Sequence, residues 1–99
     1  MRTRIYQINP DRDVNRVMFL GYDEIESVAH CDFDTSIYDK VFDGDIPEVS
    51  LEDIFFRFNF TGHPDFKGHS LSVSDIVVND YGTYYCDNFG WKKLDNIFG

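Results

Sequence analysis

A histidine, three serines and an aspartate lie close together in the stretch GHSLSVSDIVV, from Gly68 to Val78. These are the residue types of hydrolytic chemistry, in which a base activates a serine hydroxyl and a third group orients the base. The spacing argues against that use, because the adjacent residues His69 and Ser70 point to opposite faces of a strand. The sequence also has no G-x-S-x-G elbow. We predict no catalytic residue here, and a strand over 70–78 with its serines in solvent and Leu71 and Val73 in the core.

A second chemical candidate is a metal site made by His63, Asp65 and His69. Imidazole and carboxylate are suitable ligands, but a zinc centre needs a further ligand. The remaining histidine and the two cysteines show no spacing that would supply it. We therefore predict no metal and no cofactor. Instead, His69 and Asp65 are expected to hydrogen-bond the backbone of a loop shaped by Pro64 and Gly68.

Asp75 is placed directly before the apolar run Ile76–Val78. If the alternation of the strand continues unbroken, Asp75 faces the core, and its carboxylate must find donors or have its pKa raised. Alternatively, a bulge or turn at Ser74 interrupts the strand, and the carboxylate caps amides of the loop. The sequence leaves both alternatives open.

Strand-forming residues alternate or cluster in five other segments, which are separated by turn residues. The expected strands are Arg4–Ile8, Arg16–Tyr22, Tyr38–Phe42, Thr83–Cys86 and Trp91–Leu94. The second of them should lead into a short helix, because Tyr22, Ile25 and Val28 are about one helical turn apart.

The main helix is expected at about residues 50–59. Ser50 is a suitable N-cap, and acidic residues follow it in the first turn, where the helix dipole favours negative charge. Leu51, Ile54, Phe55 and Phe58 form an apolar stripe that must face the core. The sequence therefore predicts a single small α+β domain over residues 1–99, with an antiparallel β-sheet, one amphipathic helix packed on it and a C-terminal β-meander.

The net charge of −9 is concentrated in the middle third of the chain. Between Tyr22 and Asp53 there are eleven acidic residues and one basic residue, Lys40, whereas the rest of the chain has seven acidic and eight basic residues. Direct binding of nucleic acid is not expected, because phosphates are contacted by lysine and arginine. An acidic surface of this kind either keeps the protein in solution or meets a basic partner.

The cellular compartment is expected to be the cytoplasm. The only cysteines, Cys31 and Cys86, are not in a C-x-x-C motif, which favours reduced thiols. The chain shows no signal peptide and no apolar run of membrane-spanning length, so no membrane association is expected.

Aromatic residues are numerous for so small a core. They include Tyr6, Phe19, Phe55, Phe58, Phe60, Tyr84, Tyr85, Phe89 and Trp91. Two interpretations remain open: a core rich in aromatic rings, or exposed rings that form a protein-binding patch.

Four blocks of the sequence, taken in order, carry a resemblance to a known family. They are IYQ from Ile5, LEDIF with FN from Leu51 to Asn59, HPDFKGHSLSVSDIV from His63 to Val77, and YYCDNFGW from Tyr84 to Trp91. In these blocks the chain resembles the YodL-like domain, and the likeness covers nearly all of it. Cys86 and Asn88 depart from the family pattern, and residues 31–45 match it loosely.

The resemblance implies a genetic context more than a mechanism, since the family brings no established chemistry. It comprises small proteins of bacteria, phages and mobile elements, where acidic proteins often disarm CRISPR or restriction nucleases by occupying a basic channel as DNA mimics. The expectation is therefore a non-enzymatic inhibitor that binds a host nuclease through an acidic surface. The expected contact residues are Asp32, Asp34, Asp39, Asp43, Asp45 and Glu48. The alternative is a regulatory module that binds a host cytoskeletal or cell-shape protein. The oligomeric state remains open.

Overall fold

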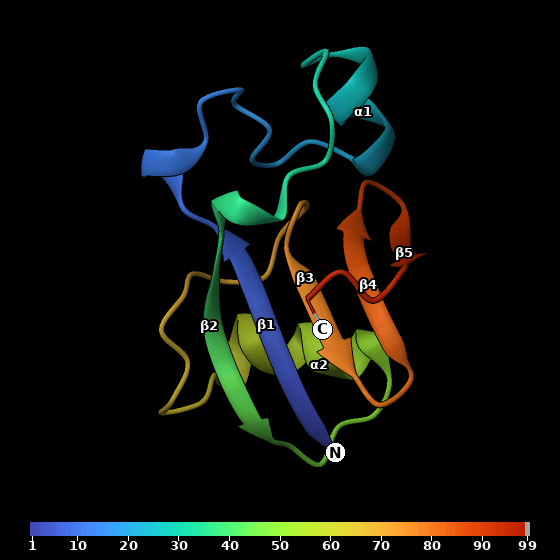
Figure 1. Ribbon diagram of the computed structural model, residues 1–99. Helices are drawn as coiled ribbons and strands as arrows, with labels where there is room; N and C mark the ends of the chain where they lie inside the picture. Colours follow the sequence, from blue (N-terminus) through green and yellow to red (C-terminus); the bar gives the residue numbers. More distant parts are fainter. Residues whose placement is uncertain (99) are drawn as a thin grey trace.

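Five antiparallel strands form one sheet in the computed structural model, which describes residues 1–98 (Figure 1). The strands are β1 (Arg2–Ile8), β2 (Tyr38–Asp45), β3 (Ile76–Asn79), β4 (Gly82–Asp87) and β5 (Gly90–Leu94). Their order across the sheet is β2-β1-β3-β4-β5, and each neighbouring pair is antiparallel. The predicted α+β class and the C-terminal meander, β3 to β5, are both confirmed.

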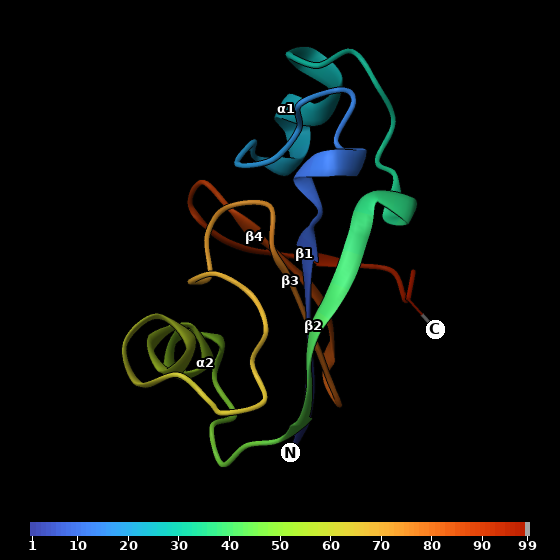
Figure 2. The ribbon, with the colours of Figure 1, turned by 90° about the vertical axis from the view of Figure 1, so that its left-hand side faces the viewer.

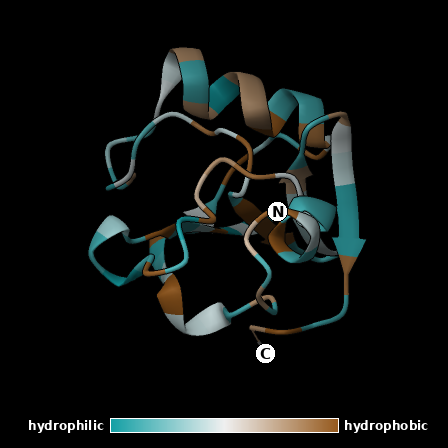
Figure 3. Cartoon of the chain, turned by 90° about the horizontal axis from the view of Figure 1, so that it is seen from above, coloured by the Kyte–Doolittle hydropathy of each residue, from teal (hydrophilic) through white to brown (hydrophobic). Residues whose placement is uncertain are grey.

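The main helix covers one face of this sheet, which we call the helix face (Figure 2). It consists of α2 (Leu51–Phe56) and a π-helical continuation, η3 (Arg57–Thr61). Ser50 caps it as predicted, because its side chain accepts a hydrogen bond from the Asp53 amide. Hydrophobic and hydrophilic residues both occur along the helix (Figure 3), and the apolar stripe turns Ile54 and Phe58 into the core.

Residues 9–37 lie together at one end of the sheet, above the strands in Figures 1 and 2. We call this segment the cap. It contains the predicted short helix as α1 (Tyr22–Ser27), flanked by two 3-10 turns, η1 (Pro10–Arg12) and η2 (Thr35–Ile37). On α1, Ile25 is buried, whereas Val28 is exposed and does not belong to the core stripe.

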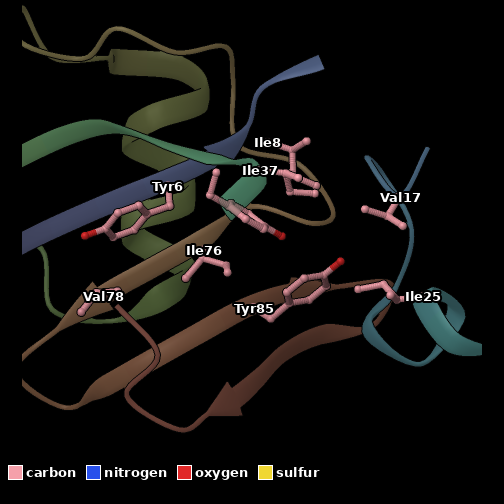
Figure 4. Close-up of a cluster of buried hydrophobic side chains, with 9 residues drawn as sticks. Tyr6, Ile8, Val17, Ile25, Ile37, Ile76, Val78 and Tyr85 are labelled. Atoms are coloured by element: carbon pink, nitrogen blue, oxygen red, sulfur yellow. The ribbon is translucent and has the colours of Figure 1, made fainter. Parts of the chain in front are cut away.

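The sheet buries apolar side chains on both of its faces. On the helix face, the buried cluster is Ile5, Phe42, Ile46, Ile54, Phe58, Leu71 and Val77. On the opposite face, the cluster joins strand residues to the cap (Figure 4) and consists of Tyr6, Ile8, Val17, Ile25, Ile37, Tyr38, Ile76, Val78 and Tyr85. The position of the cap is therefore fixed by the core of the sheet.

The predicted strand over Arg16–Tyr22 is wrong. Its first half is an irregular turn, because the Asp13 carboxylate accepts hydrogen bonds from the amides of Val17 and Met18, each at 2.9 Å. Arg16 and Phe19 have φ values of 55° and 71°, in the left-handed region that no strand uses. Local bonding by an aspartate thus prevents an extended conformation in this apolar run.

The predicted strand over 70–78 is correct only in its last part, where β3 begins at Ile76. Residues 72–75 form a turn in which Ser74 has φ of 86°. Ser74 is also fully buried, so the prediction that the serines face solvent is wrong at this position. Its hydroxyl accepts a hydrogen bond from the Phe19 amide at 3.0 Å and thereby joins the turn to the cap.

Candidate functional site

Both alternatives for Asp75 are found in the structure: its side chain is buried, and it closes a turn. One carboxylate oxygen, Oδ2, accepts hydrogen bonds from the Ser72 amide at 2.8 Å and from Gln7 Nε2 at 3.0 Å. Burial is the main cause that raises the pKa of Asp75 to about 6, although the hydrogen bonds and nearby His69 oppose it. Asp75 is 1% exposed, so this carboxylate is a structural group that no substrate reaches.

Gln7, which the sequence analysis did not identify, completes this buried network. Its amide bonds the backbone of His69 twice, as donor to the carbonyl at 2.8 Å and as acceptor from the N–H at 3.1 Å. Gln7 therefore joins β1 to the loop that precedes β3. The only signal in the sequence was an amide residue on a strand whose neighbours, Tyr6 and Ile8, are apolar.

The polar residues with chemical potential are not assembled into a reacting group. His69 Nδ1 lies 2.7 Å from the carbonyl oxygen of Ser70, and His63 Nδ1 accepts a hydrogen bond from the Asp65 amide at 3.1 Å. Within residues 1–98, no three side chains of His, Cys, Asp or Glu converge as a metal site would require. His69 thus contacts the loop backbone as predicted, whereas the prediction for Asp65 is wrong: within residues 1–98 its exposed carboxylate accepts no backbone hydrogen bond, and His63 accepts from its amide instead.

The two thiols are free and differ in environment. Cys86 is buried under the helix face, and burial, together with the negative charges of Asp75 and Asp87, raises its pKa to about 12. Cys31 is half-buried in the cap, beside a cleft that is described below. Because the thiolate is the reactive form, Cys86 is an inert core residue.

Thiol labelling is expected to distinguish the two cysteines. Because the pKa of Cys86 is raised well above 8, almost none of its side chains are thiolates at pH 8. Iodoacetamide should therefore modify Cys31 in the native protein, and Cys86 only after unfolding. Peptide mapping by mass spectrometry measures both rates, and Cys31→Ser provides the control for Cys86 alone. Equal rates at the two positions in the native protein would contradict this assignment.

The largest concave feature of the cap is a cleft of about 400 Å³. Its floor is apolar and includes Val17, Ile25, Phe33 and Ile37. Four carboxylates stand around it: Asp11, Asp13, Asp32 and Asp34. The 3-10 turns η1 and η2, the segment between η1 and α1, α1 itself and the loop after it supply these residues, so the cleft exists only when these parts of the cap are packed together.

The basic residue of the cleft, Arg12, is already neutralised. Its guanidinium pairs with Asp39 and donates to the carbonyl oxygens of Ser36 and Tyr38 at 3.1 and 3.3 Å. Two of the cleft carboxylates serve local turns, Asp13 as described above and Asp34 through the amide and hydroxyl of Ser36. Those bonds from Ser36 lower the pKa of Asp34, which therefore stays ionised.

Four carboxylates of the cap have no partner within the part of the chain that the structure describes. A second hollow, of about 370 Å³, shares Asp32 with the cleft and adds Asp23 and Glu26 from α1. Among residues 1–98, the carboxylates of Asp11, Asp23, Glu26 and Asp32 form no salt bridge and accept no hydrogen bond. These four groups are therefore free to meet charges outside the protein.

Polar contacts hold the acidic cap in a fixed orientation. The Tyr85 hydroxyl donates to the Leu20 carbonyl at 2.7 Å, and the Tyr22 amide donates to Asp87 Oδ1 at 3.2 Å. Asn88 also donates its side-chain amide to Glu24, at 2.6 Å. The cap is thus tied to β4 and to the turn that follows it.

The structure divides the six acidic residues that were expected to contact a partner. Asp39, Asp43 and Glu48 form salt bridges with Arg12, with Arg2 and Lys40, and with Arg57, respectively. Asp45 is exposed at the end of β2, away from the cap. Asp32 and Asp34 lie in the cap, so the six residues do not form one continuous face. These ion pairs join residues up to 41 positions apart, which no local pattern indicates.

No helix within residues 1–98 is long and apolar enough to cross a membrane. The fold and these surfaces define a small α+β domain with an acidic cap. The model of the YodL-like domain matches residues 2–97, and the chain belongs to that family. Comparison with curated proteins and with solved structures gave no match.

Proposed function

We propose that this protein is a non-enzymatic inhibitor from a phage or mobile element that binds a host nucleic-acid-targeting defence nuclease of the CRISPR or restriction type in the cytoplasm. The observation that carries the proposal is the charge of the cap. Residues 9–37 contain seven acidic and two basic residues, a net charge of −5, and Arg12, one of the two bases, is paired with Asp39. A basic nucleic-acid channel is the complementary surface.

The cap offers carboxylates in place of phosphates. Its unpaired carboxylates are not neutralised by a base of the protein within residues 1–98, and the attachment of the cap to the sheet limits the entropy lost on binding. A strong negative field also accelerates encounter with a basic surface and weakens as salt is added. Of the six residues expected from the sequence, Asp32 and Asp34 carry the contact in this proposal. The salt-bridged Asp39, Asp43 and Glu48 contribute less, because they are already neutralised.

A charge-neutralised cap tests the proposal. The cap variant carries Asp23→Asn, Glu26→Gln and Asp32→Asn, three changes that break no bond of the fold. Its binding to a purified CRISPR effector or restriction nuclease is expected to weaken by about tenfold or more, if each lost contact contributes about 1 kcal/mol. The slope of affinity against salt concentration should also become shallower. Isothermal titration at several salt concentrations measures both quantities.

The matched control carries Asp53→Asn, Asp80→Asn and Asp95→Asn, the same change in net charge on exposed residues outside the cap. If the control weakens binding as much as the cap variant does, the attraction depends on net charge alone and the cap is not the contact surface. If wild-type protein binds none of the nucleases and leaves their DNA cleavage unchanged, the proposed function is wrong.

A second candidate function is a regulatory module that binds a host cytoskeletal or cell-shape protein. The observation in its favour is exposed aromatic surface outside the cap, at Phe56, Phe60 and Phe89. Such rings bind an apolar surface without a requirement for basic charge. Capture from a host lysate with wild-type protein and the cap variant discriminates between the two functions. A filament protein retained equally by both baits would support the second candidate and oppose the first.

A further inference from the structure

Strand β5 (Gly90–Leu94) is an open edge of the sheet. β4 lies on one side of it, and within residues 1–98 no other segment forms backbone hydrogen bonds with it. The opposite edge is different, because the Lys67 amide donates to the Val41 carbonyl of β2 at 2.9 Å and covers part of it. An open edge presents unpaired N–H and C=O groups, which can accept a further strand.

The lysines of β5 do not block this edge. Charged residues often protect an edge strand by projecting over it. Here the Lys92 ammonium lies over the ring of Tyr22, 5.2 Å from its centroid, and the Lys93 ammonium lies 5.9 Å from the centroid of Tyr84. Lys92 therefore turns toward the cap and Lys93 turns back over β4, and their positive charges flank a backbone that remains accessible.

An apolar groove of about 570 Å³ runs beside the same strand on the helix face. Phe55 of α2, Leu71 and Val73 of the loop before β3, and Trp91 of β5 line it. Two acidic residues, Glu52 and Asp87, also line it, so the side chains that enter the groove must be apolar and uncharged. The rings of Phe55 and Trp91 meet edge to face at 6.3 Å. Trp91 faces this side because it pairs with Cys86, which lies under the helix face, so the neighbouring Lys92 points to the opposite face.

We propose that β5 binds an extended segment of a partner protein in which apolar and acidic residues alternate. The segment adds to the sheet as a sixth strand. Its apolar side chains enter the groove beside Trp91, and its acidic side chains lie on the opposite face beside Lys92. The alternation follows from the geometry of a strand, whose successive side chains point to opposite faces. This site borders the acidic cap at Lys92, whose ammonium lies over Tyr22, but it prefers the opposite charge in a partner.

A second copy of the chain fits this edge poorly. Antiparallel pairing of β5 with its own copy would bring Lys92 and Lys93 close to the same lysines of the partner, and like charges across a pair of strands are unfavourable. The net charge of −9 adds a general repulsion between copies. An acidic partner strand has the opposite effect at the two lysines, and this charge complementarity selects it over self-association.

The probe for this site is a capped synthetic peptide of about six residues, the usual length of a strand, in which valine alternates with glutamate. Trp91 is the only tryptophan, so its fluorescence reports occupancy of the groove directly. The expected result is a saturable emission change, with NMR amide shifts concentrated in β5 and around the groove. Methylation of alternate peptide nitrogens should weaken binding by about tenfold or more, because it removes the strand donors.

A charge exchange provides the second arm of the experiment. Lys92→Glu should lower the affinity for the glutamate peptide by roughly fivefold and raise the affinity for a matching lysine peptide by a similar factor. Lys67→Glu is the control, since it makes the same charge change in an exposed loop away from β5. Absence of saturable binding, equal binding of the methylated peptide, or an equal effect of Lys67→Glu would each overturn the proposal. So would a β5-mediated dimer detected by analytical ultracentrifugation.

Discussion

Replacement of Asp75 with asparagine should be more favourable to stability at pH 8 than at pH 4, by about 2 kcal/mol in the free energy of unfolding. The carboxyl group is buried and has a pKa of about 6 in the fold, compared with 3.8 for a free aspartate. About two pKa units separate the states, and each unit corresponds to about 1.4 kcal/mol. Asparagine keeps an acceptor oxygen for Ser72 and Gln7, and it cannot ionise.

The sign follows from the raised pKa. Well below pH 3.8, Asp75 is protonated in both the folded and the unfolded chain, and its favourable contribution is fully present. As the pH rises toward 6, the unfolded chain releases the proton while the folded chain retains it, so the free energy of unfolding falls. Above the folded pKa the loss is complete. The neutral residue in Asp75→Asn avoids that loss.

Urea unfolding of both proteins at several pH values between 4 and 8 measures this effect. The quantity of interest is the difference between the two proteins, because carboxylates with lowered pKa values, such as Asp39 and Glu48, destabilise both equally as they become protonated. Asp80→Asn, at an exposed site, is the control and should show a flat difference. A difference for Asp75→Asn that does not change with pH would refute the buried, ionisable carboxylate.

Replacement of Tyr85 with alanine should destabilise the protein by about 3–5 kcal/mol and release the cap from the sheet. Tyr85 is fully buried on β4, where its ring contacts Tyr22 edge to face at 5.4 Å and Phe33 at 6.1 Å. Its hydroxyl also donates to the Leu20 carbonyl, which would lose its partner. One side chain thus joins the sheet to both halves of the cap.

Ile54→Ala is the matched comparison. Ile54 is equally buried, but it lies on α2, on the other face of the sheet. Its removal should cost about 2–5 kcal/mol without a specific effect on the cap. Hydrogen exchange distinguishes the two variants, since amides of residues 9–37 should lose protection preferentially in Tyr85→Ala. Equal protection of the cap in both variants would show that Tyr85 does not anchor it.

The same comparison has a functional consequence. The carboxylates of the cap keep their arrangement on the molecule only while the cap is held against the sheet. Tyr85→Ala should therefore also lower the affinity of the cap for any partner. The apolar lining of the β5 groove lies outside the cap, whereas Lys92 contacts Tyr22 of the cap. In Tyr85→Ala, peptide binding at β5 should therefore be reduced less than partner binding at the cap.

Several elements could be predicted from the sequence because their causes are local. Ser50 and the apolar spacing of Leu51, Ile54 and Phe58 specify the main helix within about ten residues. The turn between β3 and β4 and the turn between β4 and β5 are likewise specified by short polar and glycine-containing segments. The meander follows from them, because adjacent strands joined by tight turns pair with each other.

Other elements were mispredicted because apolar residues are buried in irregular segments too. Val17 lies in the core although no strand contains it, since the Asp13 carboxylate holds the backbone in a turn. Leu71 is buried in a loop for a similar reason, because Asp75 turns the chain just before β3. Alternation of apolar residues indicates which side chains are buried, and a side chain can be buried without an extended backbone.

The sequence by itself determined the fold class, the main helix, the C-terminal meander, the family and the excess of negative charge. Only the tertiary structure decided which carboxylates remain free, because Asp43 meets Arg2 and Lys40 while Asp32 meets no base. It also decided that Gln7 and Asp75 share a hydrogen bond across 68 positions. The physical reason is the separation in sequence of the residues that interact. Helix caps and turns depend on neighbours in sequence, whereas ion pairs, clefts and open edges depend on how distant segments pack.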